Sequence, residues 1–242
     1  MNKIACLINA ISFLALPWTS AAETGKHLFI LSGQSNMAGV RPDESFTPTL
    51  EKEFGAGNVI VVRNAQGGQP IRRWYKNWQP KKGERPAGNG DLYDVLLDKI
   101  REAAGDTKLE TLTFLWMQGE RDAREGHGEV YGESLRGLIA QLSVDMGRQD
   151  INIVIGRLSD HDLTNVKCPH WTMIREIQTK FVEETPRSAL VETDDLNDGV
   201  GRKGEKMVND LHFTAEGYRI FGQRLAEAAI GLIKGGDANE SK

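Results

Sequence analysis

The chain has 242 residues, of which 39% are hydrophobic and 26% are charged, and its formal net charge is −4. This length and composition predict one globular domain with a sizeable hydrophobic core. The negative charge argues against a nucleic-acid partner and against an anionic membrane surface, because both favour a basic face on the protein.

The first residues have the pattern of an export signal. Lys3 supplies a positive charge, residues 4–17 are uncharged and mostly apolar, and small residues at 20–22 fit a cleavage site near Ala22. The apolar stretch is too short for a comfortable membrane span, and no longer one follows. We therefore expect residues 1–22 to be a signal peptide, so that the protein is periplasmic or secreted and its mature chain has no membrane span. A buried N-terminal helix is the alternative.

The rest of the chain alternates between two hydrophobic periods. Apolar, β-branched-rich runs predict five strands, at residues 27–32, 58–64, 111–117, 151–158 and 189–192. Apolar residues at steps of three and four predict helices at residues 131–146, 171–181 and 218–232. Thr214 is the expected N-cap of the last helix.

Near-continuous apolar strands are typical of a parallel sheet that is covered on both faces. We therefore expect an α/β fold, a three-layer α/β/α sandwich around a five-stranded, mainly parallel sheet. It would form one catalytic domain over residues 23–234, followed by a polar C-terminal tail at 235–242.

Polar loops follow the first two predicted strands, where ligands bind in open α/β sheets. Ser35 lies in Gly-Gln-Ser-Asn-Met at 33–37, at a turn whose free backbone N–H groups could stabilise an oxyanion. Gly67 and Gly68 could let backbone amides approach a ligand closely. Each feature alone is also compatible with an ordinary polar turn.

Two further segments carry polar groups suited to catalysis. Trp-Met-Gln-Gly-Glu at 116–120 offers the amide of Gln118 and the carboxylate of Glu120, although a solvated loop with an internal Glu–Arg pair is the alternative. His212 stands near Asp210 and just before a helix cap, and no other histidine has this setting. No pair of histidines has metal-ligand spacing, so we expect no protein-bound metal.

With Ser35, Gly68, Gln118 and His212 in this order, the chain resembles the SGNH hydrolases. Within them it is most similar to the sialate O-acetylesterase-like group and to the family 6 carbohydrate esterases, which include acetylxylan esterases. The resemblance extends from Phe29 to about residue 225. It implies a flavodoxin-like fold and a cofactor-free serine esterase that removes O-acetyl groups from carbohydrates through an acyl-enzyme.

The resemblance also implies roles for individual residues. Ser35 would be the nucleophile and His212 the general base and then the general acid. The backbone N–H groups of Ser35 and Gly68 and the side-chain amide of Gln118 would form the oxyanion hole.

One departure concerns the acid that orients the histidine. Many SGNH enzymes have D-x-x-H, but this chain has Asn209 at the acidic position and Asp210 only two residues before His212. Three interpretations stay open: Glu120 supplies the carboxylate, as family 6 carbohydrate esterases are thought to do; Asp210 supplies it; or a Ser–His dyad is supported by Asn209. Glu120 is preferred, followed by Asp210.

The sequence leaves the role of residues 72–78 and the identity of the substrate open. The aromatic and basic residues from Arg72 to Trp78 could form a glycan-binding rim or could pack against the sandwich. Other acyl esters, as in SGNH lipases and thioesterases, or carbohydrate binding without catalysis are the alternative functions. Xylan, pectin, sialic acid and peptidoglycan are all compatible parent glycans, and the oligomeric state is not predicted.

Overall fold

The computed structural model describes residues 25–240, and the side chains of residues 25–235. The expected signal peptide lies outside the described residues. Within them, no helix is both long and apolar enough to cross a membrane.

A five-stranded parallel sheet forms the centre of the molecule. Its strands are β1 (Lys26–Gly33), β2 (Val59–Ala65), β3 (Leu109–Met117), β4 (Asn152–Gly156) and β5 (Ser188–Val191). Their order is β2-β1-β3-β4-β5, and every neighbouring pair is parallel. The five predicted strands are confirmed within one to two residues at most ends. Because the strand order reverses at β1, the expected ligand crevice lies at the carboxyl ends of β1 and β3.

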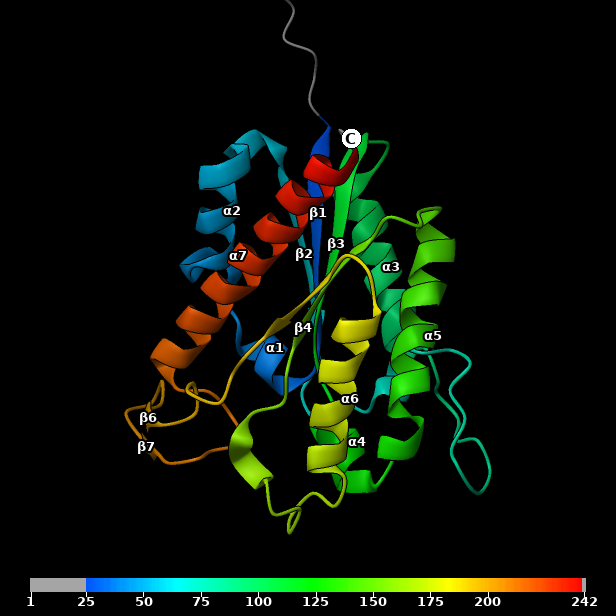
Figure 1. Ribbon diagram of the computed structural model, residues 1–242, viewed down its shortest axis with the longest axis vertical. Coiled ribbons are helices and arrows are strands. Elements are labelled where there is room, and N and C mark those ends of the chain that lie inside the picture. The colour runs from blue at the N-terminus through cyan, green and yellow to red at the C-terminus, as the bar shows by residue number, and fades with distance from the viewer. Residues whose placement is uncertain (1–24, 241–242) are drawn as a thin grey trace, which may run out of the picture.

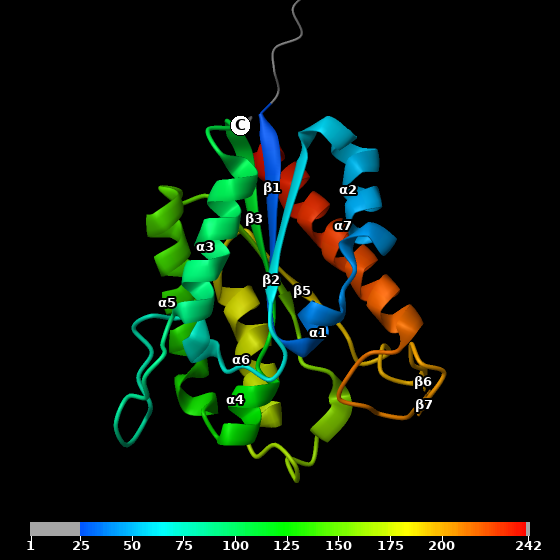
Figure 2. The same cartoon turned by 180° about the vertical axis from the view of Figure 1, so that it is seen from behind.

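Helices cover both faces of this sheet, which confirms the three-layer sandwich. α2 (Phe46–Phe54) and α7 (Ala215–Glu240) lie on one face. α3 (Asp91–Ala104), α5 (Gly128–Met146) and α6 (Trp171–Glu184) lie on the other (Figures 1 and 2). α7 extends into the expected polar tail.

The predicted helical stripe on α5 is part of the core. Tyr131, Leu135, Leu138 and Leu142 are fully buried. The N-cap prediction for α7 is also confirmed, because Thr214 Oγ1 accepts a hydrogen bond from the N–H of Gly217 at 2.8 Å.

Short elements gather at the carboxyl edge of the sheet, which is the lower end of the molecule in Figure 1. α1 (Ser35–Gly39) follows β1, and α4 (Glu120–Glu125) follows β3. An antiparallel hairpin of β6 (Gly199–Val200) and β7 (Lys206–Met207) precedes α7. Three 3₁₀ helices of the described residues, Pro42–Glu44, Ile71–Arg73 and Asp160–Asp162, follow α1, β2 and β4, whereas a fourth, Ala56–Asn58, precedes β2 at the opposite edge.

The two tryptophans after the glycine pair belong to the core and do not form a glycan-binding rim. Trp74 and Trp78 are at most 1% exposed. Trp74 packs edge-on against Trp116 and Trp78 against His127, each with ring centroids 5.2 Å apart. Buried indole faces cannot stack on a sugar, so the packing alternative is the correct one for these two side chains.

Candidate active site

A pocket of about 310 Å³ opens at the carboxyl edge of the sheet. It brings together four of the predicted site residues: Ser35, Gly68, Glu120 and His212. Its other lining residues are Gln34, Gly67, Arg121, Arg124 and Leu211. These side chains come from loops that are far apart in the sequence, and the parallel sheet places them at one edge.

The turn that carries Ser35 is held by the neighbouring strand. Gly33 has φ +139°, and a Cβ atom at this position would lie 2.0 Å from the carbonyl oxygen of Met117. The N–H of Gln34 donates to that oxygen at 2.9 Å, and the carbonyl of Gly33 accepts from the N–H of Gln66 at 3.0 Å. Glycine is therefore required at position 33, and Ser35 is fixed as the first residue of α1.

Two backbone donors of the predicted oxyanion hole are available. Among the described residues, neither the N–H of Ser35 nor that of Gly68 donates a hydrogen bond. Gly68 has φ +69°, and Gly67 is close enough that a Cβ atom there would lie 3.6 Å from Ser35 Cβ. Free N–H groups beside a nucleophile are what an oxyanion hole needs.

Gln118, the third predicted oxyanion donor, lies behind the pocket. It is fully buried. Its Nε2 donates to Asp122 Oδ2 at 2.6 Å, to the carbonyl of Gln69 at 3.1 Å and to Gln34 Oε1 at 3.2 Å. This amide has no hydrogen left for a substrate in this arrangement, so Gln118 ties three segments of the site together. Its role as an oxyanion donor stays a prediction.

Asn36 joins the helix of the nucleophile to the loop of the histidine. Its Nδ2 donates to Glu120 Oε1 at 3.1 Å and to the carbonyl of Leu211 at 3.0 Å. Its Oδ1 accepts from the Tyr218 hydroxyl at 3.1 Å. Asn36 belongs to the Gly-Gln-Ser-Asn-Met segment at 33–37, but no role could be predicted for it from the sequence, because its three partners are distant in the chain.

The two candidate acids occupy different positions relative to His212. The carboxylate of Asp210 lies 3.8 Å from His212 Nδ1, and its Oδ1 also accepts from the backbone N–H of His212 at 2.8 Å. Both side chains are about half exposed. Glu120 is buried, is held by Asn36, and has no ion pair with the imidazole within the described part of the chain. The carboxylate beside His212 is thus Asp210, although the preferred candidate was Glu120; the catalytic role of each stays a prediction.

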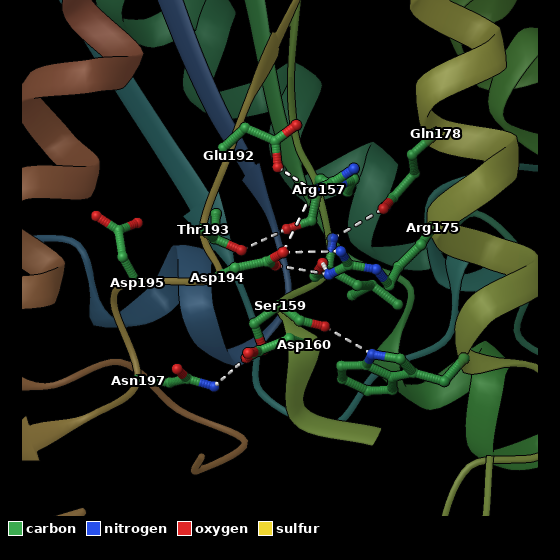
Figure 3. A network of polar contacts seen from close by, with 12 residues as sticks. Arg157, Ser159, Asp160, Arg175, Gln178, Glu192, Thr193, Asp194, Asp195 and Asn197 are labelled. Carbon is green, nitrogen blue, oxygen red and sulfur yellow. Dashed lines mark hydrogen bonds and ion pairs between the residues drawn. The ribbon is translucent and has the colours of Figure 1, made fainter. Parts of the chain in front are cut away.

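Asn209, which stands at the position of the usual acid, has its side-chain partner on another loop. Its φ is +43°, and its Oδ1 accepts from Asn197 Nδ2 at 3.3 Å. The same Nδ2 donates to Asp160 Oδ1 at 3.1 Å and to the carbonyl of Asp210 at 3.1 Å. Figure 3 shows Asn197 and Asp160 on the loops after β5 and β4. These loops hold the histidine loop in place through hydrogen bonds.

Burial controls the charge of two acids at the start of α4. It raises the pKa of Glu120 to about 7 and that of Asp122 to about 7, against ordinary values of 4.5 and 3.8. Hydrogen bonds from Asn36 and Gln118 act in the opposite direction and are outweighed. One oxygen of each carboxyl group, Glu120 Oε2 and Asp122 Oδ1, is buried without a hydrogen-bond partner in the described structure.

These raised pKa values predict how stability changes with pH. Between about pH 4 and pH 7, Glu120 and Asp122 are protonated in the folded protein but ionised in the unfolded chain. The folded state therefore binds more protons, and the free energy of unfolding falls as the pH rises through this range. Urea unfolding of Glu120→Gln should show a pH dependence flatter than that of the wild type by about 1 kcal/mol per pH unit near pH 6. Glu129→Gln, which changes an exposed carboxylate, should leave the dependence unchanged; equal slopes for Glu120→Gln and the wild type would contradict the prediction.

Two arginines of the pocket were not identified from the sequence. Arg121 forms an ion pair with Glu125 at 2.7 Å, whereas Arg124 has no carboxylate at ion-pair distance in the part of the chain that the structure describes. The sequence signal that could have identified them is their position one and four residues after Glu120, because the short helix α4 brings both side chains to the pocket. Among residues 25–235, no group of three or more His, Cys, Asp and Glu side chains is arranged to hold a metal ion.

Solved structures with this fold come from several kinds of organism. A protein of Arabidopsis thaliana matches with a TM-score of 0.65 and 18% identity, over 86% of this chain and 99% of its own. A carbohydrate acetylesterase from Xanthomonas citri matches with a TM-score of 0.60 and 18% identity, over 86% of this chain and 57% of its own. A lipase/acylhydrolase from Enterococcus faecalis matches with a TM-score of 0.52 and 11% identity, over 85% of this chain and 96% of its own. At these identities the likeness establishes the fold.

The comparison with family models is more specific. Residues 38–231 match the model described as "Carbohydrate esterase, sialic acid-specific acetylesterase". The match begins just after Ser35 and includes the segments of Gly68, Glu120 and His212. No curated protein matches the sequence significantly. Since the matched segment is most of the chain, the protein belongs to this family of carbohydrate esterases and is a carboxylic ester hydrolase.

Proposed function

We propose that this protein hydrolyses O-acetyl esters on carbohydrates, with Ser35 as nucleophile and His212 as acid–base. The observation that carries the proposal is the single pocket lined by Ser35, Gly68 and His212, in a chain of the carbohydrate esterase family. The free N–H groups of Ser35 and Gly68 support it, because a serine ester hydrolase must stabilise an oxyanion.

The proposed reaction has two steps. His212 takes the proton of the Ser35 hydroxyl as its oxygen attacks the acetyl carbonyl, and the negative charge moves onto the carbonyl oxygen beside the N–H groups of Ser35 and Gly68. The tetrahedral species expels the sugar oxygen, which receives the proton from His212. Water then attacks the acetyl-serine with the same proton transfers, and acetate and free Ser35 are released.

The charge of the pocket bears on the parent sugar. The guanidinium of Arg124 lacks a carboxylate partner and lines the same pocket as Ser35. Arg124 has a side-chain hydrogen bond with Cys168, but a guanidinium has five N–H donors, so it is still suited to binding a carboxylate. We therefore infer that acetylated acidic sugars, such as sialic or uronic acids, are favoured over neutral ones, which matches the wording of the family name.

Acyl-chain preference tests the proposal against hydrolysis of lipids or thioesters. Acetyl esters should be the best of a series from acetyl to decanoyl, because the pocket has a volume of only about 310 Å³ and the charged side chains of Glu120, Arg121 and Arg124 line it. Acetate release from a panel of acetylated glycans, measured by mass spectrometry, would identify the sugar. A preference for decanoyl esters would contradict the proposal. Glycan binding without ester turnover between pH 6 and 9 would indicate an inactive carbohydrate-binding protein instead.

Export is part of the proposal, on the pattern of residues 1–22. Cleavage after Ala22 would give a mature protein that begins at Glu23. N-terminal sequencing of the protein from the periplasm or medium tests this, and an intact Met1 on that protein would contradict it.

A further inference from the structure

A second hollow adjoins the active site at His212. Its volume is about 420 Å³, within the range of small-molecule sites. It is lined by Arg202, Glu205, Lys206, Met207, Asp210, His212, Phe213 and Tyr218. The hollow shares His212 with the catalytic pocket but is lined neither by Ser35 nor by Gly68. We call it the hairpin hollow, because strand β7 and the turn between β6 and β7 supply its basic residues.

The chemistry of ester hydrolysis places the acyl group and the alcohol of the substrate at different residues. The acyl carbon bonds to Ser35, and its oxygen lies at the oxyanion N–H groups. The alcohol must contact the acid that protonates it, which is His212 in the proposed mechanism. Since the two pockets meet at His212, a substrate whose acetyl group lies at Ser35 can extend past His212 into the hollow, and the part of the substrate beyond the acetyl group is the sugar alcohol.

The hairpin is anchored to the fold. Arg202 pairs with Glu44 at 3.2 Å, and its guanidinium lies 5.0 Å from the ring centroid of Tyr218. Glu205 accepts a hydrogen bond from the N–H of Lys203 at 2.9 Å across the turn. These contacts give the hollow a defined wall.

The charges of the hollow suit a hydroxyl-rich ligand. Arg202 and Lys206 face two carboxylates, Glu205 and Asp210, so these four side chains carry no net charge. Arg202 is engaged by Glu44, whereas Lys206 is exposed and has no ion-pair partner within the described residues. An ammonium group supplies three hydrogen-bond donors, and carboxylates supply acceptors, which together match the hydroxyl groups of a sugar.

We propose that the hairpin hollow binds the sugar unit that leaves as the alcohol, with Lys206 donating hydrogen bonds to its oxygens. This inference rests on the proposed function and extends it, since it assigns a carbohydrate subsite to a segment outside the catalytic loops. The subsite contributes to binding of the glycan and is not used by an acetyl ester that lacks a sugar.

Two substrates and two lysine variants test this subsite. For Lys206→Ala, KM for an acetylated oligosaccharide should rise about tenfold, which is the loss of one hydrogen bond to a charged group, with little change in kcat. The kinetics of 4-nitrophenyl acetate should stay within twofold of the wild type. Lys203→Ala is the matched control. Lys203 is an exposed lysine of the same hairpin but does not line the hollow, so its removal should change the kinetics of neither substrate.

Different outcomes would contradict the sugar subsite and the proposed esterase function. An unchanged KM for the oligosaccharide in Lys206→Ala, or an equal change for both substrates, would overturn the subsite. A wild-type protein inactive on both acetyl esters would overturn the proposed function itself. Calorimetry with Ser35→Ala and the deacetylated oligosaccharide gives an activity-independent measurement, in which adding Lys206→Ala should weaken binding about tenfold.

Discussion

Replacing Ser35 with alanine is expected to lower kcat for acetyl-ester hydrolysis by about 10⁴- to 10⁶-fold. The substitution removes the only atom that forms the acyl-enzyme bond and leaves the backbone N–H of residue 35 in place. Binding should change little, because the oxyanion donors, His212 and the arginines of the pocket are retained. Steady-state kinetics with an acetyl ester, and mass spectrometry of the protein trapped with a serine-directed phosphonate, measure the two parts of this prediction.

Ser32→Ala is the matched control for this variant. Ser32 lies three residues earlier on β1, is fully buried, and donates its hydroxyl hydrogen to the carbonyl of Asn64 at 2.9 Å. Its loss should cost about 1 kcal/mol of stability and little activity. Ser35→Ala with activity within tenfold of the wild type would remove Ser35 from the mechanism. A phosphonate adduct on Ser35→Ala would identify another nucleophile.

The spacing of apolar residues was enough to predict the five strands of the sheet and helices α5, α6 and α7. The α5 stripe was predictable because residues at steps of three and four must share one buried face. α2 and α3 were not predicted. α2 spans nine residues, includes Pro48, and buries only Phe46 and Leu50, so its apolar signal is weak. α3 follows a long glycine- and lysine-rich loop, which obscured its N-terminus.

The candidate site was predictable where chemistry and strand ends coincide, as for Ser35 and His212. It was not predictable where a side chain's role depends on distant partners. Gln118 looks like a free amide donor in the sequence, but Gln34, 84 positions away, and Asp122 occupy it. Composition also could not reveal that Trp74 and Trp78 are buried, since aromatic residues suit both a sugar platform and a core.

The second large effect concerns the acid that supports His212. Asp210→Asn is expected to lower kcat by at least about 10²-fold, because a neutral amide cannot stabilise the imidazolium that forms during proton transfer. Triad enzymes lose up to about 10⁴-fold on this change, and the smaller expectation follows from geometry. Asp210 is about half exposed, and its carboxylate lies 3.8 Å from Nδ1, beyond hydrogen-bond distance. If Asp210 orients His212, a side-chain rotation would bring its carboxylate within hydrogen-bond distance of Nδ1.

Glu120→Gln is expected to lower kcat by less than about tenfold. The glutamine keeps an oxygen for the hydrogen bond from Asn36, and Glu120 has no ion pair with His212 in the described structure. Asp195→Asn, which changes an exposed carboxylate paired with Arg224, serves as the control for Asp210→Asn. The opposite ranking, with Glu120→Gln the more damaging variant, would make Glu120 the orienting acid. If both variants keep near-wild-type activity, the protein works as a Ser–His dyad. The imidazole is then oriented without a carboxylate, by the hydrogen bonds that hold the histidine loop. These bonds run from Asn36 to the carbonyl of Leu211 and from Asn197 to the carbonyl of Asp210.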